Sequence, residues 1–149
     1  MRLEDELQQT HFDSEVLKAL LNVLVTADKI SAATNTALKP FGISKEQFNV
    51  LRILRGQHPE PATVQSIAAR MISKSSNATR LVEKLRCKGL LERRQCASDR
   101  RKVDVVITRE GLDLLKQVDP VMQENGYQVV NLTSEEAQQL NQLLDKLRS

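Results

Sequence analysis

Apolar residues recur at helical spacing along most of the chain, and prolines, glycines and capping residues divide this pattern into segments. A short polar helix is expected over residues 3–10. A long helix is expected from Asp13 or Ser14 to Lys39, where Pro40 would stop it. Its apolar face is wider than the single stripe with which a helix docks on its own domain. This width indicates a symmetric dimer, the commonest form of oligomer. The alternative is a helix buried centrally in a monomer.

Two shorter helices are predicted next from their capping residues. Ser44 and Gln47 have the spacing of a capping box, and the helix that they begin is expected to end at Gly56. The two prolines within residues 58–62 predict an extended connector, because both resist helix formation. Thr63 would then cap the following helix.

A third helix and a hairpin complete the central part of the chain. The helix is expected to begin near Ser73 and to end at Gly89, and an i, i+3, i+4, i+7 stripe predicts its buried face: Ala78, Leu81, Val82 and Leu85. After Gly89 the period changes, and Leu90–Arg94 and Lys102–Ile107 are predicted to be two strands. The polar loop QCASDRR joins them into a hairpin with two arginines at its tip. Two helices followed by such a hairpin are typical of a winged helix-turn-helix.

Two further helices are expected after the hairpin. Thr108 caps the first, in which Pro120 is expected to introduce a kink or an interruption and Gly126 a further loosening. Thr133 and Glu136 form a capping box for the last helix, whose apolar stripe consists of Ala137, Leu140, Leu143, Leu144 and Leu147. Exposed, this stripe would promote aggregation, so we expect it to be buried against another surface. The predicted fold class is mainly α with a small β-hairpin wing.

The basic residues are concentrated in one stretch. The chain has 22 lysines and arginines against 19 aspartates and glutamates, a net charge of +3. Residues 70–102 alone contain eleven basic and three acidic residues, a net +8, which leaves −5 for the rest of the chain. This asymmetry indicates a surface for a polyanion. An ordinary solvated face, the alternative, would contain more acidic side chains.

Other function classes find little support in the sequence. It contains no Gly-rich phosphate loop, metal-binding cluster or plausible Ser/His/Asp set, so neither an enzyme nor a cofactor is expected. No apolar run approaches the roughly 20 residues of a membrane span and no signal peptide is recognisable, so we expect a cytoplasmic protein. Cys87 and Cys96 lack zinc-site spacing. They are interpreted as incidental thiols, with redox sensing as the alternative because both lie in the basic stretch.

The outward face of the helix predicted after Ser73 carries residue types that contact DNA. Short hydrogen-bonding side chains suited to base edges stand near its N-terminal end, and cations suited to phosphates are added along it: Ser75, Ser76, Asn77, Thr79, Arg80 and Lys84. In the hairpin, Arg93 and Arg94 are expected to contact phosphates.

Two stretches, NATRLVEKLRCKGLLERR at 77–94 and SDRRKVDVVITREG at 98–111, resemble the DNA-binding core of the MarR family of dimeric bacterial transcriptional regulators. In that family an Asp-x-Arg pattern in the wing loop places an arginine in the minor groove. Asp99 and Arg101 match this pattern, with Arg100 between them. The resemblance therefore implies that Asp99 orients Arg101, and that Arg101 and Arg100 reach a minor groove.

The resemblance also implies how the chain is organised. Residues 1–149 would form one subunit, with a winged-helix DNA-binding lobe at about 41–108. The segments at about 12–39 and 109–149 would be dimerisation helices, because the family interleaves its first and last helices between two subunits.

The combined prediction is a sequence-specific transcriptional regulator that binds double-stranded DNA as a homodimer on a pseudo-palindromic operator, with repression favoured. The resemblance implies control by a small aromatic effector, for which the sequence names no ligand residues, or by oxidation at Cys87. The alternative function is a winged-helix protein–protein interaction module without specific DNA binding.

Overall fold

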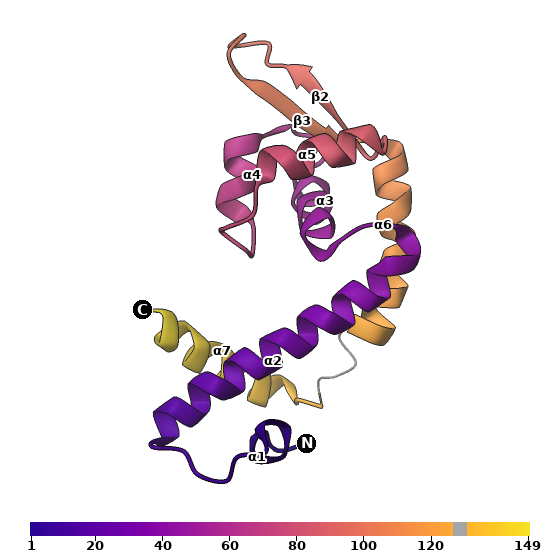
Figure 1. The fold of residues 1–149 in the computed structure, drawn as a ribbon. Coiled ribbons are helices and arrows are strands. Elements are labelled where there is room, and N and C mark those ends of the chain that lie inside the picture. Colours follow the sequence, from indigo (N-terminus) through magenta and orange to yellow (C-terminus); the bar gives the residue numbers. More distant parts are fainter. Residues whose placement is uncertain (127–130) are drawn as a thin grey trace.

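The structure is a computed structural model in which residues 1–126 and 131–149 are described. They form a winged-helix lobe, a long helix that leads into it and further helices at both ends of the chain (Figure 1). The predicted fold class is confirmed. In chain order the elements are α1 (Leu3–Leu7), α2 (Glu15–Leu38), a 3₁₀ turn (Lys39–Phe41), α3 (Lys45–Gln57), β1 (Ala62–Thr63), α4 (Val64–Arg70), α5 (Ala78–Cys87), β2 (Leu91–Gln95), β3 (Val103–Ile107), α6 (Arg109–Val121), a π-helical turn (Met122–Gly126) and α7 (Ser134–Arg148).

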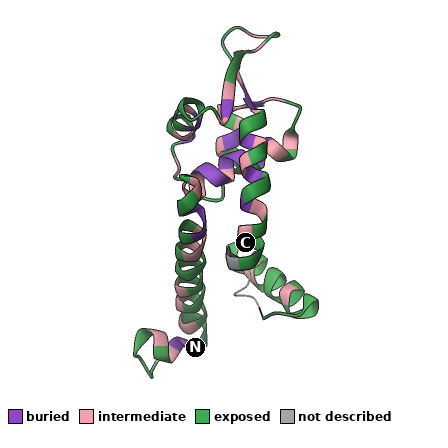
Figure 2. Ribbon diagram, turned by 90° about the vertical axis from the view of Figure 1, so that its right-hand side faces the viewer, coloured by how far each residue is buried: buried purple, intermediate pink, exposed green. Residues whose placement is uncertain are grey.

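The hydrophobic core lies inside the lobe (Figure 2). It is enclosed by α3, α4, α5, α6 and the sheet, all of which supply fully buried side chains: Leu51, Leu54, Ile67, Val82, Leu85, Val105, Leu115 and Val118. α2 buries Ala37 and Leu38, at the end where it enters the lobe. Most of the length of α2 therefore lies outside the core of its own chain.

A three-stranded antiparallel sheet forms the wing and its base, in the order β1-β3-β2. β2 pairs with β3 from Leu91 opposite Ile107 to Gln95 opposite Val103, so both predicted strands are confirmed to within one residue. The sequence analysis missed β1, the two-residue strand that pairs with the other edge of β3. Two residues are too few to show an alternating pattern, and only the distant partner strand identifies them.

Side-chain caps begin the helices where the sequence predicts them, with one exception. The predicted caps accept hydrogen bonds from the backbone N–H three residues further along: Ser44, Thr63, Thr108 and Thr133. The prediction that α5 begins near Ser73 is wrong. α5 begins at Ala78, because Asn77 Oδ1 accepts the backbone N–H of Arg80 at 3.1 Å and so caps the helix. Ser73 lies in the turn between α4 and α5.

α6 continues through Pro120 to Val121, so the proline does not interrupt the helix where it stands. The hydrogen-bond pattern changes directly afterwards, to a π-helical turn that ends at Gly126. Residues 127–130, which belong to the predicted C-terminal dimerisation segment, lie outside the described residues.

The apolar faces of α2 and α7 are exposed in the single chain. On α2, Val16 is 69% and Leu24 65% exposed, and on α7 Leu143 is 65% exposed. α7 has no buried residue at all, and in the view of Figure 2 it stands apart from α2. A helix α2 buried centrally in one chain is thereby excluded. The expected burial of the α7 stripe is likewise not achieved within one subunit.

α1 folds back onto α2 through charge as well as apolar contact. Leu3 is buried, Lys18 Nζ donates to Glu4 Oε1 at 2.5 Å, and Lys29 pairs with Glu6. The hydrogen bond from Lys18 lowers the pKa of Glu4 from 4.5 to about 2. α1 is therefore an ordered lead-in that carries two ion pairs to the long helix.

Candidate nucleic-acid interface

α5 presents an exposed polar face because its apolar residues point into the lobe. Thr79, Arg80 and Lys84 are exposed, while the buried stripe consists of Ala78, Val82 and Leu85. Gly89 ends this region with a φ of +74°, the left-handed conformation that its position predicts. The face with the predicted DNA contacts is thus the face that the fold leaves free.

The turn that precedes α5 carries the short polar side chains. Ser75 and Asn77 are exposed and Ser76 is half-buried. Five of the predicted contact residues line one groove of about 500 Å³: Ser75, Ser76, Asn77, Arg80 and Lys84. Glu46 and Gln47, from the first turn of α3, also line it. Asn77 Oδ1 is used by the cap, so the NH₂ group of this side chain is what remains for a base edge.

Of the six cations predicted to contact DNA, four are exposed and have no acidic partner among the described residues. Arg80 and Lys84 on α5, and Arg100 and Arg101 in the wing loop, form no ion pair with any residue in 1–126 or 131–149. Figure 1 shows that α5 and the hairpin lie on the side of the lobe away from α1 and α7. These four unpaired charges are therefore displayed on α5 and on the loop of the hairpin that follows it.

The two arginines of β2 differ from these four, because each is paired with an acid. Arg93 lies 3.1 Å from Glu83 Oε2, and Arg94 pairs with Glu92. Arg86 also donates to Glu83, at 2.6 Å from Oε1, and this hydrogen bond lowers the pKa of Glu83. The sequence analysis missed these pairings. Two of them are local, Glu83 with Arg86 on α5 and Glu92 with Arg94 on β2, and only that of Arg93 with Glu83 needs β2 to pack against α5.

Asp99 shapes the wing loop through the backbone. Its Oδ1 accepts the backbone N–H of Arg101 at 2.9 Å, and its carbonyl accepts the N–H of Lys102 at 3.1 Å. The N–H of Cys96 in turn donates to the carbonyl of Lys102 at 3.2 Å. Asp99 thus binds the backbone of the loop at Arg101 and Lys102, and among the described residues it forms no ion pair with the Arg101 guanidinium.

Lys88, one of the cations in the basic stretch, has a structural role. Its Nζ donates to the carbonyl of Gly42 and, at 3.3 Å, to Oε1 of Gln47. Gln47 is 7% exposed, and its Oε1 also accepts the backbone N–H of Ser44. Lys88 therefore ties the C-terminal end of α5 to the start of α3. Nothing in its sequence neighbourhood distinguishes it from the outward-facing cations.

The two cysteines occupy different settings. Cys87 is exposed at the end of α5, 3.8 Å from Glu83 Oε1, and Cys96 is half-buried at the start of the wing loop. Hydrogen bonds with Ser98 lower the pKa of the Cys96 thiol. Within the described parts of the chain, no group of His, Cys, Asp and Glu side chains is arranged to hold a metal ion. No helix there is long and apolar enough to cross a membrane.

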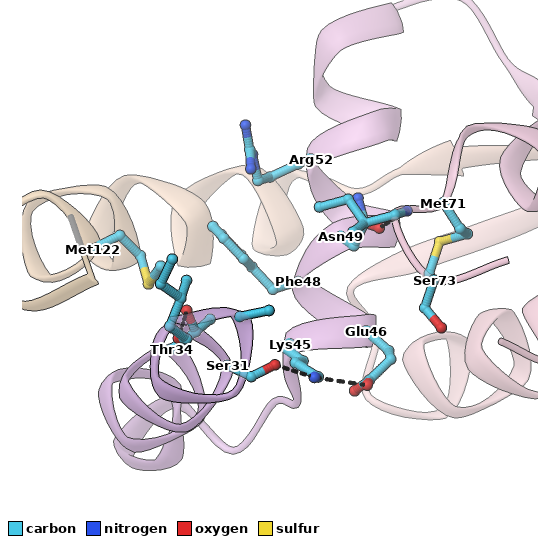
Figure 3. Close-up of a pocket in the computed structure, with 13 residues that line it drawn as sticks. Ser31, Thr34, Lys45, Glu46, Phe48, Asn49, Arg52, Met71, Ser73 and Met122 are labelled. Carbon is cyan, nitrogen blue, oxygen red and sulfur yellow. Dashed lines mark hydrogen bonds and ion pairs between the residues drawn. The ribbon is translucent and has the colours of Figure 1, made fainter. Parts of the chain in front are cut away.

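A cavity of about 360 Å³ lies where α2 meets the lobe (Figure 3). Its wall is largely apolar, with Ala27, Ile30, Phe48, Met71, Ile72 and Met122 among the lining residues. Lys45, Glu46 and Arg52 are its charged residues. Lys45 Nζ lies 3.9 Å from Glu46 Oε1, and the Arg52 guanidinium lies 5.6 Å from the centre of the Phe48 ring. The sequence analysis assigned no residue to a ligand cavity, because the lining comes from four separate segments.

Comparison with known proteins agrees with this architecture. A sequence model of the MarR family matches residues 43–103. The chain is 30% identical to the transcriptional repressor MprA of Escherichia coli over 122 residues, which are 81% of this chain and 69% of MprA.

Solved structures of MarR proteins share the fold. A MarR transcription factor from Planctomyces limnophilus is 34% identical, with 91% of this chain and 98% of that chain covered and a TM-score of 0.68. A mutant of MarR from E. coli in complex with operator DNA is 26% identical, with 99% of each chain covered and a TM-score of 0.75. The identity to MprA over more than two thirds of both chains, with the family match across the lobe, shows that this chain belongs to the MarR family of transcriptional regulators.

Proposed function

We propose that this regulator binds double-stranded DNA as a homodimer on a two-fold symmetric operator. The observation that carries the proposal concerns the six cations predicted to contact DNA. Four of them are exposed and have no acidic partner among the described residues: Arg80, Lys84, Arg100 and Arg101. Cations already neutralised by carboxylates would gain less from phosphates. These four keep their full charge for a polyanion, and they stand on the helix and loop that a winged helix brings to DNA.

The contacts are divided between the two grooves. α5 enters the major groove, where Ser76, the NH₂ group of Asn77 and the guanidinium of Arg80 meet base edges, and Ser75, Thr79 and Lys84 add base or phosphate contacts. Arg101, with Arg100, enters the flanking minor groove, whose narrow A·T tracts attract guanidinium groups. Arg93 and Arg94 contact phosphates, and more weakly, because Glu83 and Glu92 already pair with them.

A second copy of the chain covers the exposed faces of α2 and α7. Each large apolar side chain contributes about 1.5–3 kcal/mol when it is fully buried. The two helices leave several such side chains exposed: Val16, Leu17, Leu20, Leu24, Leu140, Leu143 and Leu147. A two-fold dimer buries both faces and presents two copies of α5 to successive major grooves, about one helical turn apart.

Repression is favoured because the relative MprA is a transcriptional repressor. The cavity beside α2 is the proposed site of a small aromatic effector. Its apolar wall suits a ring. Arg52, which forms no ion pair among the described residues, suits a carboxylate or phenolate better than Lys45, which pairs with Glu46. Its volume of about 360 Å³ lies in the range of roughly 300–1,000 Å³ that is usual for small-molecule sites.

A salt titration tests DNA binding directly. The affinity of the full chain for a duplex carrying its operator is measured by fluorescence anisotropy between 50 and 300 mM salt. Each phosphate contact adds about 0.9 to the slope of log K against log salt concentration, so a steep fall is expected. A flat response, or equal binding of an acidic protein and of duplex DNA, would instead favour an interaction module.

A further inference from the structure

Two hydrogen-bonded tethers hold α5 to α3, one beyond each end of the helix. Before α5, the backbone N–H of Ile72 donates to Oδ1 of Asn49 at 2.8 Å. After α5, Lys88 Nζ donates to the Gly42 carbonyl and to Gln47 Oε1. Both tethers link segments far apart in sequence, and they add to the core packing of Val82 and Leu85, through which α5 is held in the lobe.

The first tether carries the turn with the base-reading side chains. Met71 is 2% exposed and anchors the start of the turn by packing, and Ala78 is buried at its other end. Among residues 72–77 none is buried, and the side chain of Ile72 is 82% exposed. Among the hydrogen bonds of the described residues, the bond from Ile72 to Asn49 is the one that joins this exposed turn, which contains Ser75, Ser76 and Asn77, to α3.

The same tether forms part of the cavity wall. Asn49, Met71 and Ile72 all line the cavity beside α2. In Figure 3, Asn49, Met71 and Ser73 lie at one end of the cavity, opposite Thr34 and Met122. Ser73 and Glu46 line both this cavity and the groove that holds the predicted DNA contacts. The second tether differs, since neither Lys88 nor Gly42 lines the cavity.

We propose that Asn49 is a positioning residue through which occupancy of the cavity is transmitted to DNA. A hydroxylated aromatic ligand offers a donor to Asn49 Oδ1 and displaces the N–H of Ile72. The turn at 72–77 is then released, and the side chains that precede α5 lose their fixed place at the base edges. This inference rests on the proposed DNA binding and effector site, and it assigns the connection between them to one side chain.

Four proteins test the inference: the parent, Asn49→Leu, Asn49→Asp and Lys88→Met. Leucine has a similar size but no acceptor, whereas aspartate keeps an acceptor for the N–H of Ile72. Lys88→Met removes the tether that lies away from the cavity. Two quantities are measured for each, the amide hydrogen exchange of residues 72–77 and the duplex affinity, both with and without 3-hydroxybenzoate as the probe.

In the parent, the probe is expected to speed exchange in residues 72–77 and to weaken duplex binding. Asn49→Leu should show both effects without the probe, by about 2- to 12-fold per subunit, the equivalent of one hydrogen bond at about 0.5–1.5 kcal/mol. It should then give no further response to the probe. Asn49→Asp should keep parental exchange. Lys88→Met should bind duplex more weakly but retain the response to the probe. If Asn49 were merely structural, Asn49→Leu would also retain that response, and the two variants would behave alike.

Three results would overturn the proposal. The first is amide exchange of residues 72–77 in Asn49→Leu at the parental rate. The second is an undiminished response of that variant to the probe. The third is a parent protein whose duplex affinity does not change at a saturating concentration of the probe. A parent that fails to bind duplex at all would refute the proposed function instead. In that case the exchange measurements alone decide the role of Asn49: faster exchange in Asn49→Leu supports it, and unchanged exchange overturns it.

Discussion

Replacing Arg101 with alanine isolates the contribution of the wing to DNA binding. The side chain is exposed and forms no ion pair within the described residues, so its removal leaves no acid unpaired. The loop should also keep its shape, because Asp99 binds the backbone N–H of residue 101, which alanine retains. Any loss of affinity therefore reports the arginine side chain and not the fold.

The size of the effect follows from the contact and from the symmetry. One arginine contact to DNA contributes about 1–3 kcal/mol. A symmetric dimer loses the contact twice, about 2–6 kcal/mol, which is at least roughly a 30-fold rise in Kd at about 1.4 kcal/mol per tenfold change. The affinity is measured by fluorescence anisotropy at one fixed salt concentration, because phosphate contacts are strongly salt-dependent.

Arg94→Ala is the matched control on the same hairpin. Arg94 pairs with Glu92, so its charge is partly neutralised before DNA arrives, and a smaller loss is expected. Asp99→Asn should bind almost as the parent does, because its amide oxygen can still accept the N–H of Arg101. Asp99→Ala should bind more weakly. The reasoning is refuted if Arg101→Ala binds within twofold of the parent, or no more weakly than Arg94→Ala.

Three further predictions concern stability and assembly. A Cβ at Gly111 would lie 2.2 Å from the Leu90 carbonyl oxygen, so Gly111→Ala should lower the free energy of unfolding by at least about 1–3 kcal/mol. A Cβ at Gly56 would meet open space, so Gly56→Ala should raise the free energy of unfolding by about 0.5–1 kcal/mol. Both are measured by urea denaturation, and equal stabilities of the two variants would contradict this prediction. Leu143→Glu should shift the chain from dimer to monomer in sedimentation velocity, and an unchanged dimer would remove α7 from the interface. The pKa of Glu4 is lowered from 4.5 to about 2, so its ionised form stabilises the α1 contact fully at pH values above about 4.5 and this stabilisation is lost as the pH falls towards 2. Amide exchange in α1 should therefore be constant from pH 7 to 5 and rise as the pH falls from about 4.5 towards 2. An α1 whose exchange, corrected for intrinsic rates, does not change in that window would show that the pair with Lys18 does not hold it.

Local signals explain which parts of the fold the sequence predicts. The capping boxes at Ser44 and Thr133 each need only the four residues that form them, and the repeating apolar positions of α2 and of α7 each lie within one contiguous segment. The glycine that ends the α5 region is equally local, since Gly89 alone supplies the positive φ. Features of this kind do not depend on what lies opposite them in the folded chain.

Most of the features that the sequence analysis missed depend on contacts between distant segments. The start of α5 is an exception, because Asn77 caps the helix through a local hydrogen bond from the N–H of Arg80, and the sequence offers Ser73 as a second capping residue four positions earlier. The roles of the cations were only partly predictable, since Lys88 turns towards Gly42, 46 residues away, while Arg80 faces outward. The cavity is lined by residues from four segments, so no single stretch of the sequence predicts it.

Selection of bound sequences from a random pool of duplexes, followed by sequencing, tests the central claim most directly. If two copies of α5 and of the Arg101 wing meet DNA together, the enriched sequences will form an inverted repeat. Its half-sites will lie about one helical turn apart, with A·T-rich flanks where the wings lie. A pool without enrichment, or an enriched site without two-fold symmetry, would contradict the account.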